Sequence, residues 1–437
     1  MVFFRVILFA SIYFISFKVF GIEVLTLEGA LKEANQNSLL VQKAQASMEE
    51  MKWKKRETSS GYLPVFTAGL NYLTDKKYML LDTTLGGNNL TIPQVVPTTQ
   101  YTLRATLPLF DGLVNIKRYQ AGALLEEASS KDLEWTVFSI HRQTILQFYK
   151  SLSTQVLSEV AEQNLKTLQD HLKDIKAFKK VGVSTNYDVL RVEVQVSEAS
   201  SEWLNSQDNV EIAKYKLGEI LGKEQEIRLL NGKLPILNES IINHIDQNIL
   251  EKRTDILALK LKTQAQEKNY EGLSRYWIPR ISIFGEAQYY NNKNDRFDDS
   301  ESFRNGYLVG LNLSWNIFDG MNSISRSAQA EQQVIQTQKT LKMTEIKAKQ
   351  DFEFWKRKFK YFCSVYKSRS NDVIRSEEAV RLAKEGRKAG LRTSTDLLDA
   401  ESDLFRSRAG QVTAQIGAIE ALINLELVSG QKIYDFN

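Results

Sequence analysis

Two short segments of the chain, 181–188 and 389–396, bring together residues whose types and spacing suit charge-based chemistry. The second segment contains Arg392 and Asp396, and Asp399 follows three residues later, so that both carboxylates share one face of a helix. An exposed ion pair stabilises a structure by only about 0–1 kcal/mol. These residues are therefore suited to reversible ionic contacts that act as a set.

Residues with the chemistry of an enzyme or a metal site are sparse. No glycine-rich loop followed by Lys and Ser or Thr is present, so we expect no ATP hydrolysis by this chain. The single cysteine, Cys363, excludes a disulfide framework and a cysteine-based zinc site. His141 and His171 fall in long helical stretches, where a packed or solvated side chain is expected. We therefore predict neither an enzyme nor a bound cofactor or metal.

The charge balance argues against a nucleic-acid partner. The 437 residues include 57 Lys and Arg and 53 Asp and Glu, a net charge of +4. A nucleic-acid-binding protein is expected to concentrate basic residues in a patch or stripe. Charged residues make up 25% of the chain and hydrophobic residues 43%, which excludes wholesale disorder.

Both polar segments also have the chemistry of a tight turn between helices. Gly182 can adopt the positive φ that ends a helix, and Thr185 with Asp188 matches the capping pattern that starts the next one. Thr393 and Asp396 repeat this pattern. Turn formation alone is one explanation, but it requires neither the arginine nor the second carboxylate of the later segment.

The two segments belong to an internal repeat. Phe110-Asp111-Gly112 recurs as Phe318-Asp319-Gly320, and the turn at 181–185 recurs at 389–393, both with an offset of 208 residues. A constant offset over this length predicts two copies of one structural unit. The predicted organisation is a signal peptide at 1–21, a first repeat at 22–222, a linker at 223–240, a second repeat at 241–430 and a tail at 431–437.

Each repeat is expected to contain a very long helical hairpin. Nothing clearly breaks a helix over 113–180 or 321–388, and no proline occurs in either range. About 70 residues at 1.5 Å each reach about 100 Å, which predicts a helical tube or stalk. A coiled-coil seam with steps of three and four residues consists of Leu165, Leu168, Leu172 and Ile175, followed by Val189, Val192, Val196, Ala199 and Trp203.

Four shorter segments alternate between apolar and polar residues and are predicted to be strands. They are residues 63–73, 100–110, 279–290 and 306–317. About ten residues with one apolar face match a tilted strand of a membrane barrel, although a soluble sheet packed on one face shows the same alternation. Four strands cannot close a barrel around a wide lumen, and lipid does not tolerate an open sheet edge. Membrane strands would therefore require several copies of the chain, and three copies would supply twelve strands.

The N-terminus has the features of a secretory signal. Arg5 precedes an apolar run over 6–17, and Val19 and Gly21 suit the −3 and −1 positions of a cleavage site. An uncleaved membrane anchor is the alternative. Cleavage would leave a mature chain of residues 22–437 in an exported compartment.

Together these features resemble the TolC-like outer-membrane efflux family, over essentially the whole mature chain. The resemblance rests on the two Phe-Asp-Gly strand exits, the two hairpin turns, the repeat and the positions of the strands. It implies an α+β membrane protein that forms a homotrimer, with a twelve-stranded β-barrel in the outer membrane and an α-helical coiled-coil tunnel across the periplasm. Loops 74–99 and 291–305 would face the exterior. The implied function is a passive exit duct that works with a periplasmic adaptor and an inner-membrane pump.

The resemblance also assigns roles to the hairpin turns. The gating residues at the periplasmic mouth would be Asp188, Arg392, Asp396 and Asp399, and a ring of such carboxylates would disfavour anions. Arg387 stands where some members of the family have an aromatic gating residue, so the closed network could differ here. The adaptor would dock on Val181, Gly182, Ser184, Thr185, Gly390, Leu391 and Thr393.

A membrane-anchored coiled-coil interaction protein without a pore is the alternative from a different class. It would leave the four alternating segments and the constant offset of 208 residues unexplained. Within the channel class, small-molecule efflux, metal efflux and type I protein secretion are all compatible with the sequence, because cargo choice resides largely in the pump.

Overall fold

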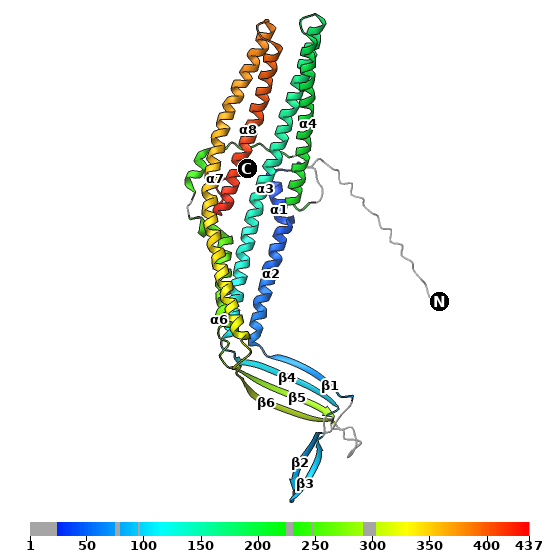
Figure 1. Cartoon of the computed structure of the whole chain (residues 1–437), viewed down its shortest axis with the longest axis vertical. Helices are drawn as coiled ribbons and strands as arrows, with labels where there is room; N and C mark the ends of the chain where they lie inside the picture. The colour runs from blue at the N-terminus through cyan, green and yellow to red at the C-terminus, as the bar shows by residue number, and fades with distance from the viewer. Residues whose placement is uncertain are drawn as a thin grey trace, which may run out of the picture.

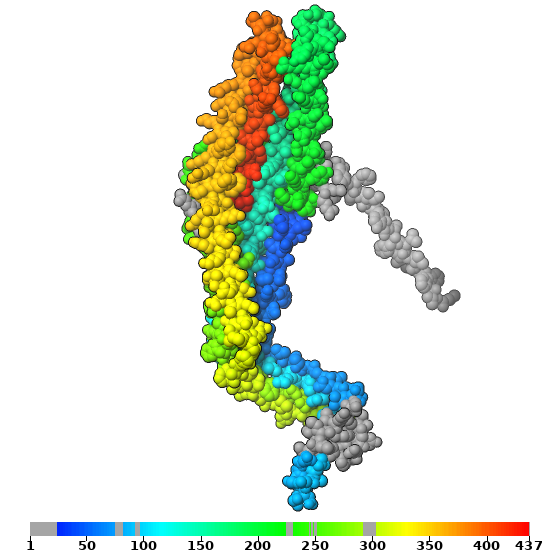
Figure 2. Space-filling model, viewed as in Figure 1, coloured from blue at the N-terminus to red at the C-terminus, as the bar shows by residue number. Residues whose placement is uncertain are grey.

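The chain folds into a long rod of helices with a small sheet at one end (Figures 1 and 2). The structure, a computed structural model, describes residues 24–74, 79–94, 97–223, 230–245, 248–291 and 303–436. The signal peptide predicted at 1–21 lies outside these residues. The turns of both helical hairpins lie at the end of the rod opposite the sheet (Figure 1).

Two helical hairpins form most of the rod. In the first, α3 (Val114–Lys180) is followed by α4 (Asn186–Ile220), and in the second, α7 (Asn322–Lys388) is followed by α8 (Ser394–Ser429). α3 and α7 contain 67 residues each, which corresponds to about 100 Å of helix. The first residues of α3 and α7 are 208 positions apart, and so are those of α4 and α8. The spacing of the sequence motifs is therefore also the spacing of the helices.

The Phe-Asp-Gly motifs form the turns from which both long helices start. The carboxylate of Asp111 accepts a hydrogen bond from the N–H of Asn115 at 2.7 Å, and Asp319 accepts one from the N–H of Ser323 at 3.0 Å. The glycine after each aspartate has a positive φ, 74° in the first motif and 68° in the second. Glycine adopts this conformation without steric cost, so each motif reverses the chain from strand to helix.

Shorter helices flank the hairpins near the sheet and at mid-length. Before the first strand, the extended backbone of Ser38 ends α1 (Leu27–Asn37) before α2 (Leu39–Ser59) begins. α2 packs along α3, and α6 packs against both α3 and α7. The shorter elements are α1 (Leu27–Asn37), α2 (Leu39–Ser59), the 3-10 helices η1 (Ser60–Tyr62) and η2 (Glu239–His244), α5 (Ile249–Lys252) and α6 (Thr254–Leu273).

The main hydrophobic core lies at mid-length, where helices of both hairpins meet the shorter elements. Its fully buried side chains include Phe148 from α3, Ile256 from α6, Phe359 from α7 and Leu422 from α8. In the described part of the chain, α8 is also the one helix long and apolar enough to cross a membrane, yet 61% of its most apolar window is buried in the protein. We therefore interpret α8 as a core helix.

A four-stranded antiparallel sheet forms the far end of the rod. Its strands pair in the order β1 (Val65–Tyr72), β4 (Thr99–Phe110), β5 (Arg280–Asn291) and β6 (Phe303–Ser314). β6 begins and ends three residues earlier than the sequence analysis expects. The side chain just beyond its end takes part in the junction with the helices, because the Trp315 indole N–H donates to the Trp277 carbonyl oxygen at 3.0 Å.

The segment 74–99, which we expected to be a loop, contains a β-hairpin. β2 (Met79–Leu85) pairs antiparallel with β3 (Asn88–Gln94). Gly86 and Gly87 form the turn with φ values of 62° and 87°, the conformation of a two-residue hairpin turn. Most of the second expected loop, 291–305, lies outside the described residues.

Candidate functional site

The two hairpin turns have the same backbone hydrogen bonds. In the first, the N–H of Val183 donates to the carbonyl of Phe178 at 2.9 Å, across Gly182 with a φ of 80°. In the second, the N–H of Leu391 donates to the carbonyl of Gly386 at 2.8 Å, and the intervening glycine has a φ of 73°. Both are Schellman motifs, in which glycine in the left-handed region ends the helix.

Each outgoing helix then starts with a complete capping box. The hydroxyl of Thr185 accepts from the N–H of Asp188 at 3.2 Å, and the carboxylate of Asp188 accepts from the N–H of Thr185 at 2.8 Å. Thr393 and Asp396 make the same two bonds at 3.2 Å and 2.8 Å. The hydrogen bonds from the threonine, first from its N–H and then from its hydroxyl, lower the pKa of each aspartate. Each carboxylate therefore caps the N-terminus of the helix that follows its own turn.

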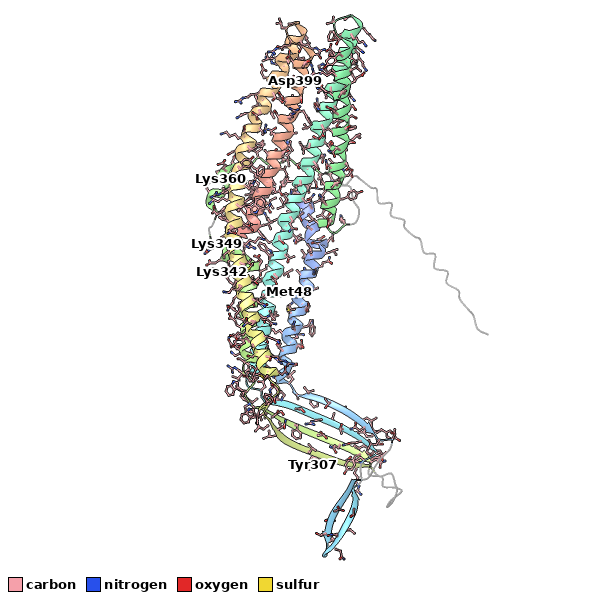
Figure 3. All side chains as sticks on the ribbon, in the orientation of Figure 1. Met48, Tyr307, Lys342, Lys349, Lys360 and Asp399 are labelled. Atoms are coloured by element: carbon pink, nitrogen blue, oxygen red, sulfur yellow. The ribbon has the colours of Figure 1, made fainter. Side chains whose placement is uncertain are left out.

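A single chain does not bring the predicted gating residues together. Among the described residues, no ion pair within 4.0 Å joins Arg392 to Asp188, Asp396 or Asp399. The Arg392 side chain instead lies over Gly386, where an added Cβ would be 2.7 Å from its Cγ. Asp399 is exposed on α8, below the turn (Figure 3). Within one chain, Arg392 acts on Asp396 through its charge alone, which adds to the threonine hydrogen bonds in lowering the pKa of that carboxyl.

The residues predicted to dock an adaptor lie at the outermost points of the rod. Val181 is 73% exposed and Leu391 is 82% exposed. A Cβ added to Gly182 or Gly390 would meet no atom within 4 Å. The remaining predicted residues of the turns, Ser184, Thr185 and Thr393, are exposed or half-buried. Two exposed side chains that the sequence analysis did not select, Val183 and Tyr187, extend the apolar surface of the first turn.

The sequence analysis missed a buried polar cluster below the turns. His171 on α3 is only 4% exposed. Its Nε2 lies 2.9 Å from Oγ of Ser394 and 3.2 Å from Nη1 of Arg387, and its Nδ1 lies 3.4 Å from Oε2 of Glu401. The cluster connects the first hairpin to both helices of the second. The spacing of residues in the sequence does not show that α3 lies next to α7 and α8. The available signal was Arg387, which stands where some members of the family have an aromatic residue.

Further contacts join the two hairpins at the same level. Nη1 of Arg191 on α4 donates to Oγ1 of Thr395 on α8 at 2.9 Å. Leu398 of α8 is buried against the seam of the first hairpin, next to Leu168 and Val192. The turn of the second hairpin is therefore held against both helices of the first.

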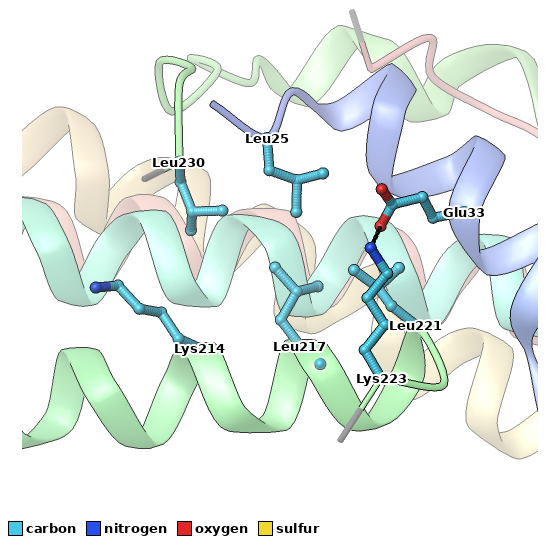
Figure 4. Close-up of a pocket in the computed structure, with 8 residues that line it drawn as sticks. Leu25, Glu33, Lys214, Leu217, Leu221, Lys223 and Leu230 are labelled. Carbon is cyan, nitrogen blue, oxygen red and sulfur yellow. Dashed lines mark ion pairs between the residues drawn. The ribbon is translucent and has the colours of Figure 1, made fainter. Parts of the chain in front are cut away.

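A small apolar pocket lies between α1 and α4, away from the turns (Figure 4). At its edge, Nζ of Lys223 and Oε2 of Glu33 form an ion pair at 3.1 Å. Four leucines contribute most of the apolar lining: Leu25 and Leu230, which form an isolated β-bridge, and Leu217 and Leu221 at the end of α4. Within the described residues, no three His, Cys, Asp or Glu side chains converge to hold a metal.

The register of the sheet places most of the apolar residues of its four strands on one face. Ala68, Leu103, Ala287 and Tyr307 form one cross-strand row, and Tyr307 is 89% exposed (Figure 3). Further exposed apolar side chains on this face are Phe66, Leu70, Val309, Leu311 and Leu313. An exposed apolar surface of this extent marks a membrane or protein contact.

The opposite face of the sheet is more polar, although Val65, Phe284 and Leu308 also lie on it. Thr67, Arg104 and Glu286 form a cross-strand row, in which Nη1 of Arg104 lies 3.7 Å from Oε2 of Glu286. The Arg104 guanidinium also lies over the ring of Phe284. Small residues and hydroxyl groups fill much of the rest of this face, so it is suited to water.

Comparison with known proteins identifies the family. The sequence profile described as "Outer membrane efflux protein" matches residues 30–223 and 246–431. The chain belongs to this family. The match includes both hairpins and all four strands of the sheet, and it confirms the resemblance inferred from the sequence.

Two characterised relatives of this efflux protein are distant. Outer membrane protein TolC of Vibrio cholerae is 21% identical over 302 residues, which cover 66% of this chain and 68% of TolC. Outer membrane efflux protein BepC of Brucella suis is 21% identical over 420 residues, 94% of this chain and 86% of BepC. These relatives and the family match place the efflux protein in the outer membrane. They do not favour the alternative of a coiled-coil protein without a pore.

Solved structures share the fold of the efflux protein. The Campylobacter jejuni CmeC outer membrane channel matches with a TM-score of 0.76 at 14% identity, over 92% of this chain and 85% of CmeC. The Neisseria gonorrhoeae MtrE outer membrane channel matches with a TM-score of 0.69 at 17% identity, over 93% of this chain and 89% of MtrE. The observed fold is therefore that of outer-membrane channels, mostly helical with a small sheet.

Proposed function

We propose that three copies of this efflux protein form a twelve-stranded barrel that continues into a helical tunnel and serves as a passive exit duct. The observation that carries this proposal is the four-stranded sheet. Its apolar face is exposed, and within the described residues no strand pairs with the outer edges of β1 and β6. Lipid does not tolerate unpaired backbone groups. Pairing β6 of one copy with β1 of the next satisfies them and closes the barrel.

The two faces of the sheet agree with this arrangement. The apolar face, with Phe66, Leu103 and Leu311, would contact lipid, and the polar face, with Arg104 and Glu286, would line the lumen. Twelve strands leave a lumen too wide for side chains to fill, because a barrel of about eight strands is already filled. The lumen would therefore conduct hydrated substrates.

The hairpins offer a second apolar seam for contact between copies. Tyr187, Leu190, Val194, Leu204 and Tyr215 on α4 are exposed by 54–70%. Their positions follow a heptad spacing, distinct from the buried seam against α3. We propose that this seam packs against a helix of the neighbouring copy. Such packing would extend the wall of the barrel into a helical tube, and each inferred repeat would supply one unit of that tube.

The predicted gate would then form between copies. The hydrogen bonds within the two turns use Oδ2 of Asp188 and Asp396, which leaves Oδ1 of each carboxylate available to a neighbour. Arg392 is exposed and could supply the donor, and exposed Asp399 would add to the charge around the opening. Several such pairs would have to break together when the mouth opens, so their small individual energies would add up.

The exposed turns are the proposed docking surface for a periplasmic adaptor. Gly182 and Gly390 leave open space around the backbone, which permits a close approach by a partner helix. Val181, Leu391 and their polar neighbours would supply the contacts. Energy would come from an inner-membrane pump, since the chain lacks a phosphate-binding loop. We therefore assign no enzymatic activity to the chain.

Planar-bilayer recording of the detergent-purified protein tests the proposal. We expect discrete single-channel steps in current when the protein is added at a concentration at which it runs on gels as a heat-modifiable oligomer. A matched sample unfolded by heat before addition should give none. A native oligomer that inserts and produces no steps would overturn the conduit, and so would a protein that stays monomeric and soluble without detergent.

A further inference from the structure

The charged residues of the four-stranded sheet share one face. They are Arg104, Arg280 and Arg304, with Glu286 as the single carboxylate. Strand alternation and register place all four on the more polar face, and none of the four strands contains lysine. The face proposed to line the lumen therefore carries an excess of arginine.

A cavity of about 330 Å³ opens on this face, where the sheet meets the start of α3 (Figure 1). It is lined by Arg118 from α3 and Arg280 from β5, together with the polar residues Ser282, Asn312 and Ser314. Its volume is within the range of small-molecule sites. Within the described residues, neither arginine has an ion-pair partner within 4.0 Å. Both arginines are exposed and therefore available to an anion.

The one carboxylate at this cavity is engaged in its own turn. Asp111 lines the cavity, and its Oδ2 accepts a hydrogen bond from the N–H of Asn115 at 2.7 Å. Two arginines and one carboxylate leave the cavity with an excess of positive charge. Arginine presents N–H donors in a planar fork that matches the oxygens of a carboxylate or a phosphate. The residues at the cavity therefore suit an oxyanion.

The internal repeat supplies another arginine at the position equivalent to Arg118. Arg326 follows it by 208 residues, and it too is exposed and without an ion-pair partner in the part of the chain that the structure describes. The starts of α3 and α7 have the same geometry, because the aspartate of each Phe-Asp-Gly motif accepts a hydrogen bond from the N–H four residues later. Three copies of the chain would therefore surround the junction of barrel and tunnel with Arg118, Arg280 and Arg326 from each copy.

We infer that this junction is an arginine-lined site that binds the anionic groups of transported substrates, with Arg118 and Arg280 as its primary contacts. The duct would then favour small molecules that carry a carboxylate or a phosphate group. Rings of arginine or lysine select anions in other pores. The inference rests on the proposed conduit, because the more polar face of the sheet lines a lumen only when several copies assemble.

The carboxylates at the hairpin turns act at a different place. Asp188 and Asp396 lie near the other end of the long helices, and the 67 residues of α3 correspond to about 100 Å of helix. Charges at physiological ionic strength are screened within about 8 Å. The carboxylates at the mouth therefore do not neutralise the arginines. An anion delivered past the mouth meets a site that attracts it where the tunnel enters the barrel.

Calorimetric titration of the detergent-purified oligomer with inorganic tripolyphosphate tests the site. This probe is a small polyvalent oxyanion, and its binding can be measured whether or not the oligomer conducts. We expect saturable binding that weakens as the salt concentration rises, because salt screens exposed charges. Arg118→Gln and Arg280→Gln should each weaken the binding by about tenfold or more, because each removes a charged hydrogen-bond donor from every copy. Both positions are exposed, so the oligomer should form as in the wild type.

Arg56→Gln is the matched control for these variants. Arg56 lies in the last turn of α2, near the sheet, and its guanidinium lies over the ring of Trp53, 4.6 Å from the centroid. It does not line the cavity. Its loss changes the net charge by the same amount and should leave the binding unchanged. Absence of binding to the wild type would overturn the inference, and so would equal weakening in Arg56→Gln.

Reversal potentials in planar bilayers distinguish the site from the conduit. Under a KCl gradient, Arg118→Gln should shift the reversal potential towards that of a more cation-selective pore, and Arg56→Gln should not. An oligomer that binds tripolyphosphate without passing current would contradict the conduit and still support the anion site. A conducting oligomer in which Arg118→Gln leaves both the binding and the reversal potential unchanged would overturn the inference alone.

Discussion

Arg142 on α3 and Glu426 on α8 form a buried ion pair, with Nη1 2.8 Å from Oε2, although 284 residues separate them in the sequence. The other oxygen of Glu426 accepts hydrogen bonds from the N–H groups of Ile433 at 2.6 Å and Tyr434 at 2.9 Å. One carboxylate thus joins the first hairpin, the second hairpin and the C-terminal segment at mid-length of the rod.

Removal of Arg142 should destabilise the protein strongly. Arg142→Leu would leave the Glu426 carboxylate buried without its cation, and breaking a buried pair in this way costs about 3–5 kcal/mol. The matched control is Lys150→Met, which breaks a half-exposed pair between the same two helices, Lys150 Nζ to Glu420 Oε1 at 2.7 Å. That change should cost about 0–1 kcal/mol. Thermal unfolding followed by circular dichroism compares them, and equal losses would contradict a structural role for the buried pair.

Neighbouring residues of β6 should differ sharply in their tolerance of charge. Leu311 lies on the exposed apolar face and Asn312 on the polar face. Leu311→Arg should reduce the outer-membrane oligomer, because an arginine facing lipid is destabilising, by up to about 2–4 kcal/mol depending on its depth. The oligomer should be retained in Asn312→Arg, because this arginine would face water. The amount of heat-modifiable oligomer in outer-membrane fractions measures both, and equal levels would argue against a lipid-facing sheet.

A bulky side chain at the first hairpin turn should block adaptor docking. Gly182→Trp would place a large side chain in the open space at the turn, at a backbone conformation that side chains rarely adopt, and far from the sheet. We expect cross-linking to the periplasmic adaptor to be lost and the oligomer to be unaffected. Gly87→Trp is the control, since Gly87 is another open glycine with positive φ, in the β2–β3 hairpin. Normal cross-linking by Gly182→Trp would show that the adaptor binds elsewhere.

Loss of Arg392 should open the resting channel. Arg392→Ala removes the proposed donor to carboxylates of neighbouring copies, so single-channel conductance should rise. Arg381→Ala is the matched control, because Arg381 pairs with Glu378 and Glu385 of its own helix and has no assigned gating role. Conductance that is unchanged in Arg392→Ala, or raised equally in the control, would count against the gate.

The helices and strands could be predicted because their signals are local. Gly182 and Gly390 end helices, Thr185 and Thr393 start them, and alternation defines the strands. The β2–β3 hairpin was missed because Gly86-Gly87 signals a loop as readily as a turn. The break at Ser38 was missed because it depends on one extended residue between two helix-compatible stretches.

The contacts between hairpins could not be predicted, because helical periodicity does not say which face meets a helix more than 200 residues away. The spacing of His171, Arg387 and Glu401 in the sequence gives no signal, and they form one cluster because α3 packs on α8, which brings His171 within reach of Arg387 on α7. By contrast, the turn motifs predicted that Asp188 and Asp396 cap their own helices, and the structure confirms both caps, whereas their assignment to a gate stays a prediction. A short turn motif therefore shows where the site lies in the sequence, but it does not show which residues of other helices contact it.

Disulfide cross-linking between sheet edges tests the central claim most directly. In a chain with Cys363→Ser, Leu311→Cys on β6 is combined with single cysteines along β1, Val65–Tyr72. If β6 of one copy pairs with β1 of the next, some combinations must give covalently linked trimers, with no larger product. Monomers alone from every combination, or an open ladder of larger species, would contradict a barrel closed by three copies.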